Sequence, residues 1–208
     1  MFGDPVTNPM GWEVKPLSEL LRVIGGYAFS SSGFLHEGIP VLRIGNINTG
    51  IFSSNNLVFW QYDERLERYL LYPGDIVISL TGTVGKDDYA NVCILGYEYE
   101  SYYLNQRNAK LELSEDLNKH YLTSILRAPE VKSRLTGISR GIRQANVSNS
   151  DILNLALPIP PIKLQHRFAD FIRATEKLRF KLHQGVDRLE LLYKSIMQKC
   201  FEGDFFHE

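Results

Sequence analysis

The chain has little of what marks a disulfide-stabilised, metal-binding or membrane protein. Its 208 residues include only two cysteines, Cys93 and Cys200, which lie far apart and complete no metal-ligand spacing. No apolar run approaches the eighteen or so residues that a membrane-spanning helix needs. The first residues also lack the basic start and apolar stretch of a secretion signal. We therefore expect reduced thiols, no membrane partner and a cytoplasmic location.

An excess of charge and a complete catalytic motif are also missing. The 23 Lys and Arg residues nearly balance 24 Asp and Glu, which argues against a polycation that coats nucleic acid indiscriminately. Residues 82–87 (GTVGKD) resemble part of a phosphate loop, but Leu80 replaces its first glycine and Asp87 replaces the Ser or Thr that would hold magnesium. The five histidines show no metal-binding spacing. The sequence therefore predicts a non-catalytic chain without a metal site.

A heptad pattern follows residue 160. Pro158, Pro160 and Pro161 favour extended geometry in the residues before them and mark a boundary there. From Leu164 onward, alternating steps of four and three residues reach mostly apolar positions. This spacing of 3.5 residues is what a helix needs to supercoil against another helix. The predicted coiled-coil interface consists of Leu164, Phe168, Phe171, Leu178, Leu182, Leu189, Leu192 and Ile196.

The region before the heptads has the pattern of a mixed α/β head. Strand candidates at 40–44, 75–80, 90–95 and 104–113 are rich in β-branched or aromatic residues. Short helices are expected at 63–71, 117–127 and 129–136, and none is placed to build repeated parallel crossovers. The predicted fold class is α+β, a globular domain with an irregular curved sheet over residues 1–160, followed by a long C-terminal coiled-coil α-helix over 161–203.

Two polar clusters stand out in the head. Residues 127–143 contain five basic residues and a single acid, Glu130. The overlapping segment 140–146 (RGIRQAN) combines guanidinium groups, amides and a glycine. Such groups can bind phosphates and form hydrogen bonds with base edges. A solvated turn between helices explains the stretch equally well. The second cluster, 104–107 (LNQR), follows tyrosines at 97, 99, 102 and 103, for which a structural role is favoured over base stacking.

Five segments matter by their order along the chain: 38–47 (GIPVLRIGNI), 74–79 (GDIVIS), 81–85 (TGTVG), 103–107 (YLNQR) and 157–161 (LPIPP), with Gln165 and Arg167. Together these segments resemble the specificity subunit of type I restriction-modification systems. The order and spacing of the motifs match over nearly the whole chain, although each motif alone is weak. One departure is Leu164, where the family often has an acidic residue before the glutamine; the leucine extends the apolar seam.

The resemblance implies a function for each part. Residues 1–160 would be a target recognition domain that reads one half of a bipartite double-stranded DNA target, and 161–203 a spacer helix. Family members usually carry two of each, so this chain resembles a half-length form. A homodimer with antiparallel helices would place one head at each end, as inverted half-sites require. The glycines at 45, 74, 82 and 85 are interpreted as turn residues. The candidate DNA contacts are Thr81, Thr83, Lys86, Arg107, Arg140, Arg143, Gln144 and Asn146.

The resemblance further implies a scaffold without catalytic activity. A modification (methyltransferase) subunit would supply S-adenosylmethionine, and a restriction subunit would supply ATP and Mg, so this chain itself is expected to hold no cofactor. Two alternatives stay open. A coiled-coil oligomerisation module would use the heptads without reading DNA. A metal-dependent nuclease would need paired acids, for which 63–64 (DE) and 87–88 (DD) are the nearest candidates.

Overall fold

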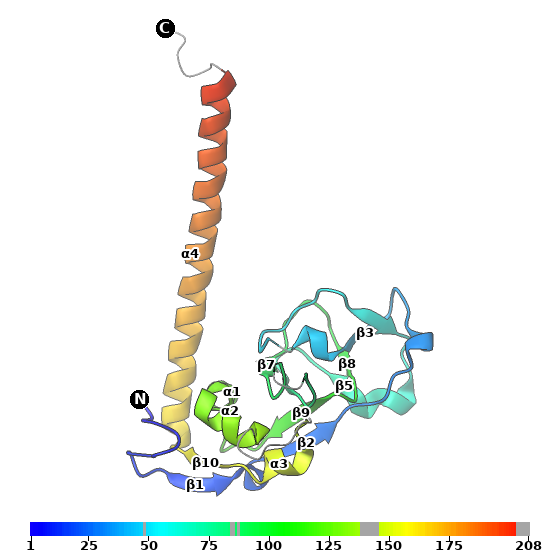
Figure 1. The fold of residues 1–208 in the computed structure, drawn as a ribbon, viewed down its shortest axis with the longest axis vertical. Helices are drawn as coiled ribbons and strands as arrows, with labels where there is room; N and C mark the ends of the chain where they lie inside the picture. Colours follow the sequence, from blue (N-terminus) through cyan, green and yellow to red (C-terminus); the bar gives the residue numbers. More distant parts are fainter. Residues whose placement is uncertain (48, 84–85, 87, 138–145, 203–208) are drawn as a thin grey trace. The chain divides into compact units, whose positions relative to one another are not determined.

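The computed structural model describes residues 1–47, 49–83, 86, 88–137 and 146–202 (Figure 1). The chain divides into two compact units, Met1–His166 and Arg167–Glu208. We call the first unit the head and the described part of the second unit the arm. The arm belongs to one uninterrupted helix, α4 (Ile162–Glu202), whose first turn lies within the head.

The larger part of the head is built on two four-stranded sheets. The first is antiparallel and has the order β2 (Leu21–Gly25), β9 (Asn108–Leu113), β6 (Ile76–Ser79) and β7 (Val92–Ile94). Strand β6 is the sequence IVIS and is buried along its whole length, which suits β-branched side chains in a central strand. Its last residue, Ser79, lies opposite Asn108 at the start of β9.

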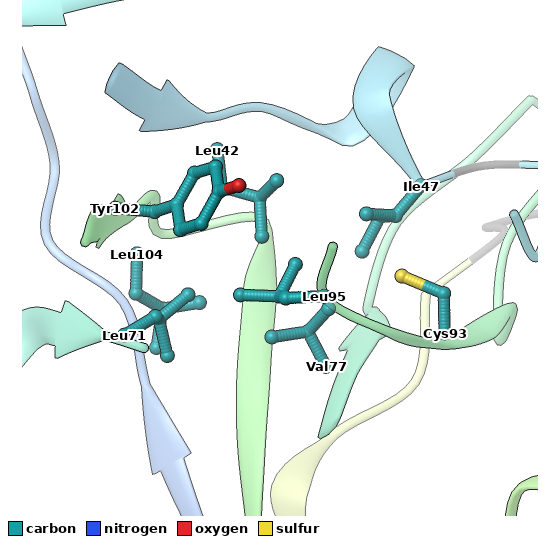
Figure 2. Packing of buried hydrophobic residues seen from close by; sticks show 8 residues of the cluster. All are labelled: Leu42, Ile47, Leu71, Val77, Cys93, Leu95, Tyr102 and Leu104. Carbon is teal, nitrogen blue, oxygen red and sulfur yellow. The ribbon is translucent and has the colours of Figure 1, made fainter. Parts of the chain in front are cut away.

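The second sheet has the order β4 (Val58–Trp60), β3 (Ile39–Leu42), β8 (Tyr102–Leu104) and β5 (Leu70–Leu71). Its strands β3 and β8 are parallel, whereas the other two pairs are antiparallel. Eight buried residues form a core between the two sheets: Figure 2 shows side chains from β3, β5 and β8 of this sheet pointing toward Val77 of β6 and Cys93 of β7. Burial raises the pKa of the Cys93 thiol to about 12, so this cysteine is an inert core residue.

A small third sheet joins the two ends of the head. Strand β1 (Glu13–Pro16) pairs antiparallel with β10 (Ala156–Ile159), which contains part of the proline-rich segment predicted to be extended. Immediately after it, the buried Gln165 side chain of α4 ties the first helical turn to the head. Its Oε1 accepts from the Asn118 N–H at 2.8 Å, and its Nε2 donates to the Pro160 carbonyl oxygen at 2.8 Å.

Short helices pack against the first sheet. Helix α1 (Lys119–Arg127) packs against β7 and α2 (Pro129–Thr136), while α3 (Asn149–Leu153) packs against β2. Asn118 caps α1 by accepting from the His120 N–H, as expected for an amide at this position. The 3₁₀ turns are η1 (Leu17–Glu19), η2 (Ser31–Gly33), η3 (Ile44–Asn46) and η4 (Glu64–Tyr69).

The predicted α+β class with a long C-terminal helix is confirmed, with two local corrections. The strand expected over 104–113 is two strands, β8 and β9, separated by a turn at 105–107, and they belong to different sheets. The helix expected over 63–71 is the 3₁₀ segment η4, followed directly by β5. Among the described residues, no helix combines the length and the apolar character needed to cross a membrane.

Candidate nucleic-acid interface

Three of the predicted contact residues lie on neighbouring backbone segments at one end of the first sheet. Beyond β6, the Leu80 N–H donates to the Arg107 carbonyl oxygen at 2.9 Å, and the Val147 N–H donates to the Leu80 carbonyl oxygen at 2.8 Å. Thr81 forms an isolated antiparallel bridge with Asn146. Thr81 is half-buried, and Arg107 and Asn146 are exposed. Backbone from three distant parts of the sequence therefore meets at this end of the sheet, which we call the Thr81–Arg107–Asn146 edge.

Backbone hydrogen bonds fix the turn that carries Arg107. The Asn108 N–H donates to the Asn105 carbonyl oxygen at 2.9 Å, and the Gln106 N–H donates to the Tyr27 carbonyl oxygen at 2.9 Å. A Cβ atom on Gly26 would lie 2.2 Å from the Asn105 carbonyl oxygen, so this position tolerates only glycine without a backbone shift. Gly26 thus lets the turn approach β2 and fixes where Arg107 stands.

Thr83 and Lys86 lie on the loop that follows Thr81. The Thr83 N–H donates to Asp88 Oδ1 at 2.7 Å, and the Lys86 N–H donates to the Thr83 carbonyl oxygen at 3.0 Å. The hydrogen bond from the Thr83 backbone is the main reason that the pKa of Asp88 lies below its ordinary value, with a smaller contribution from the nearby Lys86 charge. The ionised Asp88 therefore holds the Thr83 backbone in place, and both Thr83 and Lys86 are exposed.

A cavity of about 470 Å³ borders the same turn. Its described lining contains two arginines and no acidic residue, together with several amide side chains. Arg107 belongs both to this lining and to the edge formed with Thr81 and Asn146. The polar lining residues are Arg43, Asn46, Ser53, Asn55, Asn56, Asn105, Gln106 and Arg107.

Asn46 is one of the cavity-lining residues and is almost completely buried. Its Oδ1 accepts from the Arg43 N–H at 3.0 Å, and its Nδ2 donates to the carbonyl oxygens of Ser53 and Asn55, both at 3.0 Å. The Arg43 guanidinium donates to the Asn56 carbonyl oxygen at 2.6 Å and lies 6.0 Å from the centre of the Phe34 ring. These bonds set the loop 53–56 and Arg43 in fixed positions beside the opening.

This arrangement suits an anionic ligand that also offers hydrogen-bonding edges. Arginine forks bind phosphate oxygens and the O6 and N7 atoms of guanine, and Asn or Gln amides match the N6 and N7 atoms of adenine. Without an acid in the described lining, nothing there repels a phosphate backbone. Sequence reasoning missed Arg43, Asn55 and Asn56. The adjacent asparagines at 55 and 56 are a signal that could have pointed to this loop.

The basic cluster predicted between 127 and 143 is partly structural. The Arg127 guanidinium donates to the Val92 and Gly50 carbonyl oxygens, and Arg134 Nη2 donates to the Ala156 carbonyl oxygen at 3.0 Å. Lys132 Nζ donates to Asn91 Oδ1 at 2.6 Å. The charged groups of these three residues therefore help to hold the head together. Arg140, Arg143 and Gln144 lie outside the described residues.

The tyrosines before the turn at 105–107 differ in burial. Tyr102 and Tyr103 are fully buried, and Tyr99 packs edge-on against Tyr102, in line with the structural role favoured from the sequence. Tyr97 is the exception, because 81% of it is exposed.

Two of the four acidic residues considered for a nuclease, Asp63 and Asp88, are engaged in local bonds. Both carboxylate oxygens of Asp63 accept from the Arg65 guanidinium, at 3.0 and 2.7 Å, and these bonds are the main cause of its lowered pKa. Asp88 accepts from Thr83 as described above, and Asp87 lies outside the described residues. In the part of the chain that the structure describes, no three His, Cys, Asp or Glu side chains are grouped so as to hold a metal ion.

The predicted coiled-coil residues fall into two groups. Leu164 and Phe168 are half-buried near the start of α4. The other six, Phe171, Leu178, Leu182, Leu189, Leu192 and Ile196, are between 41% and 67% exposed. The arm therefore carries a row of large apolar side chains in contact with water, which is typical of an interaction surface.

Solved structures share the fold of this chain. The chain from a solved type I R-M system, studied for its complex assembly and conformational transition, superposes with a TM-score of 0.62 at 19% identity and matches 95% of this chain and 47% of that one. The HsdS subunit from Thermoanaerobacter tengcongensis gives 0.57 at 21% identity, over 95% and 46% of the two chains.

The chain is also similar in sequence to specificity subunits of type I restriction enzymes. The type I restriction enzyme MjaVIII specificity subunit of Methanocaldococcus jannaschii is 26% identical over 206 residues, which cover 94% of this chain and 46% of that protein. The chain thus spans about half the length of the relatives it matches. The family model of the type I restriction modification DNA specificity domain matches residues 9–190. On that match over most of its length, the chain belongs to the family of type I restriction-modification DNA specificity subunits.

Proposed function

We propose that the head reads one half of a bipartite DNA target, with the Thr81–Arg107–Asn146 edge and the adjoining cavity as its contact surface. The observation that carries this proposal is the acid-free cavity, where two arginines and several amides converge beside three predicted contact residues. Phosphate contacts would give most of the affinity, and base contacts from the arginines and amides would give the sequence preference. Binding by the chain alone is weak and salt-sensitive, because one half-site offers few phosphate contacts.

A selection experiment tests DNA reading. The full chain is incubated with duplexes carrying a randomised segment, and bound duplexes are sequenced over several rounds. We expect a short motif to be enriched. Arg107→Ala should relax the motif at one position and cost about 1–3 kcal/mol of binding to the selected duplex. Enrichment of no motif, or an Arg107→Ala variant that binds and selects as the wild type does, would contradict the proposal.

Arg65→Ala is the matched control for the loss of one positive charge. Arg65 is an exposed arginine of the head that pairs with Asp63 and does not line the cavity. Its removal changes the net charge as Arg107→Ala does, so non-specific attraction to DNA should fall equally in the two variants. Only Arg107→Ala is expected to alter the selected motif.

We further propose that the arm pairs with the arm of a second copy. The support is the exposed apolar row on the long helix α4. In an antiparallel pair, the helix ends that join the two heads lie at opposite ends of a rod about 60 Å long, at 1.5 Å per residue. Such a homodimer would hold two DNA-reading heads at a fixed separation.

Light scattering at several concentrations tests the pairing. We expect a monomer–dimer equilibrium that Leu189→Ala shifts strongly toward monomer. Leu191→Ala is the control, because Leu191 and Leu189 are the same residue type and are both 67% exposed, yet only Leu189 is on the heptad row. A monomer at every concentration, or equal effects of the two substitutions, would overturn the homodimer.

The catalytic work is proposed to belong to partners. In this proposal a modification subunit brings S-adenosylmethionine and a restriction subunit brings ATP and Mg, while this chain acts as their scaffold and supplies the DNA address without catalysing a step. The bonds that occupy Asp63 and Asp88 support a non-catalytic head. Cleavage of bare duplex by the purified chain with Mg²⁺ would overturn this assignment and favour the nuclease alternative.

A further inference from the structure

The exposed apolar row of α4 contains two small residues, and one of them, Gly185, has no explanation within the helix itself. Thr175 and Gly185 occupy heptad positions between the large apolar side chains. Glycine is the poorest helix former after proline, yet Gly185 stands well inside the 41-residue helix α4. A Cβ atom added to it would meet nothing within 4 Å, so packing within the chain gives no reason for glycine there. A close approach by another backbone does give one.

The positions of the two small residues are symmetric about residue 180. Thr175 lies five residues before this point and Gly185 lies five residues after it. In an antiparallel pair related by a two-fold axis, a residue that precedes the axis position by a given number of places faces the residue of the partner helix that follows it by the same number. With the axis at residue 180, Thr175 of each helix therefore faces Gly185 of the other.

The same axis pairs every remaining member of the row with an apolar residue. Each layer joins heptad position d of one helix to position a of the other, which is the geometry that antiparallel coiled coils need. The layers are Leu164 with Ile196, Phe168 with Leu192, Phe171 with Leu189, Thr175 with Gly185, and Leu178 with Leu182. Flanking this core, Ile172 comes to lie beside Val186 of the partner helix, which adds an apolar contact.

We infer that two copies of α4 pair antiparallel in this single register, with the two-fold axis at residue 180 and the Thr175–Gly185 layers as the points of closest approach. This inference rests on the homodimer proposed above and specifies its geometry. Because the register sets the distance between the two helix starts, it also sets the separation of the two heads.

Registers displaced by one heptad fit less well. A shift in one direction places Phe168 against Gly185 and leaves Leu178 against Thr175, so both small residues face large ones. A shift in the other direction places Leu182 against Gly185 and brings the Lys199 ammonium opposite Phe168. Both shifts also shorten the overlap or bring a charge into the seam, whereas the register centred on residue 180 keeps all apolar layers.

Disulfide trapping in the full chain tests the register. The background is Cys200→Ser, since Cys200 is exposed and Cys93 is buried. In this background, Thr175→Cys/Gly185→Cys should form a covalent dimer under mild oxidation, because each new thiol faces its counterpart in the partner helix within disulfide reach. Neither single variant should form one. A single Thr175→Cys variant that crosslinks would instead show a parallel pair, in which each residue faces itself.

Two further pairs report the displaced registers. Phe168→Cys/Gly185→Cys and Thr175→Cys/Leu192→Cys would crosslink only if the helices were shifted by one heptad, and we expect at least a tenfold slower reaction for both than for Thr175→Cys/Gly185→Cys. Circular dichroism confirms that each variant keeps its helix content. If light scattering shows a dimer but a displaced pair, a single variant or no variant crosslinks, the register is wrong and the homodimer stands. If light scattering shows only monomer, the homodimer itself fails.

Discussion

Leucine has opposite environments in the two parts of this chain. In the head, Leu42, Leu71 and Leu104 are completely or almost completely buried in the core between the two sheets (Figure 2). In the arm, Leu178, Leu182 and Leu189 are more than half exposed. The head completes its own core and should be stable as a single copy. The arm keeps its apolar surface for another molecule, so its stability should depend on concentration.

The same substitution in the two parts gives the largest expected contrast. Leu42→Ala should lower the free energy of unfolding of the head by about 2–5 kcal/mol, because it leaves a cavity in a packed core. Leu189→Ala should change the unfolding of a dilute monomer by less than about 0.5 kcal/mol, since it removes an exposed side chain and alanine favours a helix. Urea denaturation at low protein concentration measures both. Equal losses would refute the distinction between a closed head and an open arm.

The joint between the regions gives the next effect. Gln165→Ala removes the side chain that bonds Asn118 and Pro160, and leaves buried backbone groups without partners. We expect a loss of about 1–3 kcal/mol in the stability of the head. Gln184→Ala, an exposed glutamine on the same helix, serves as the control and should be neutral. A neutral Gln165→Ala would mean that the first turn of α4 is not part of the head.

Two adjacent glycines test how the head positions its contact turn. Gly26→Ala would force a shift against the Asn105 carbonyl oxygen, and overpacking of this kind costs about 1–3 kcal/mol. Gly25→Ala meets only the Asn149 amide, at 3.9 Å, and should be tolerated. DNA binding by the two variants, measured by fluorescence anisotropy on a selected duplex, should fall for Gly26→Ala alone. Equal affinities would show that the turn does not need this close approach.

A small effect of pH on stability is expected from Asp88, which accepts from the Thr83 backbone. Because the folded pKa of Asp88 lies below its ordinary value of 3.8, its contribution to stability is present above that pH and is lost as the pH falls through the lowered pKa. Asp88→Asn should therefore reduce stability slightly at neutral pH, and the difference from the wild type should vanish in strong acid. Urea midpoints between pH 7 and pH 2.5 measure this. A constant difference across that range would argue against the ionised carboxylate as the cause.

The sequence predicted the arm well because its signal is local. A heptad repeat and a proline boundary are visible along one stretch of chain, and α4 does run from Ile162 to Glu202. In the head, the pairing of β1 with β10 joins residues near opposite ends of the unit, and no local pattern reveals such a contact. The break between β8 and β9 at 105–107 also needed the fold, because no local pattern shows that the two strands belong to different sheets.

The candidate site shows the same limit. Thr81, Arg107 and Asn146 could be proposed as contacts from their chemistry and family motifs, but only the fold shows that they share an edge. The composition of 127–143 could not show that Lys132 and Arg134 donate to Asn91 and to the Ala156 carbonyl oxygen, because these acceptors belong to distant segments. Arg43 was not among the predicted contacts. It lines the cavity together with the loop 53–56, which the buried Asn46 holds in place, and no local pattern in the sequence shows this.

Spacing-dependent DNA binding tests the central claim that the heads read half-sites and the arms set their distance. Duplexes carry two inverted copies of the selected half-site, and the number of base pairs between them is varied one at a time. We expect one narrow range of spacings to bind far more tightly than a single half-site, because the second contact is then intramolecular. Leu189→Ala should abolish this gain and leave single-site binding unchanged. Affinity that is the same at every spacing would contradict the account.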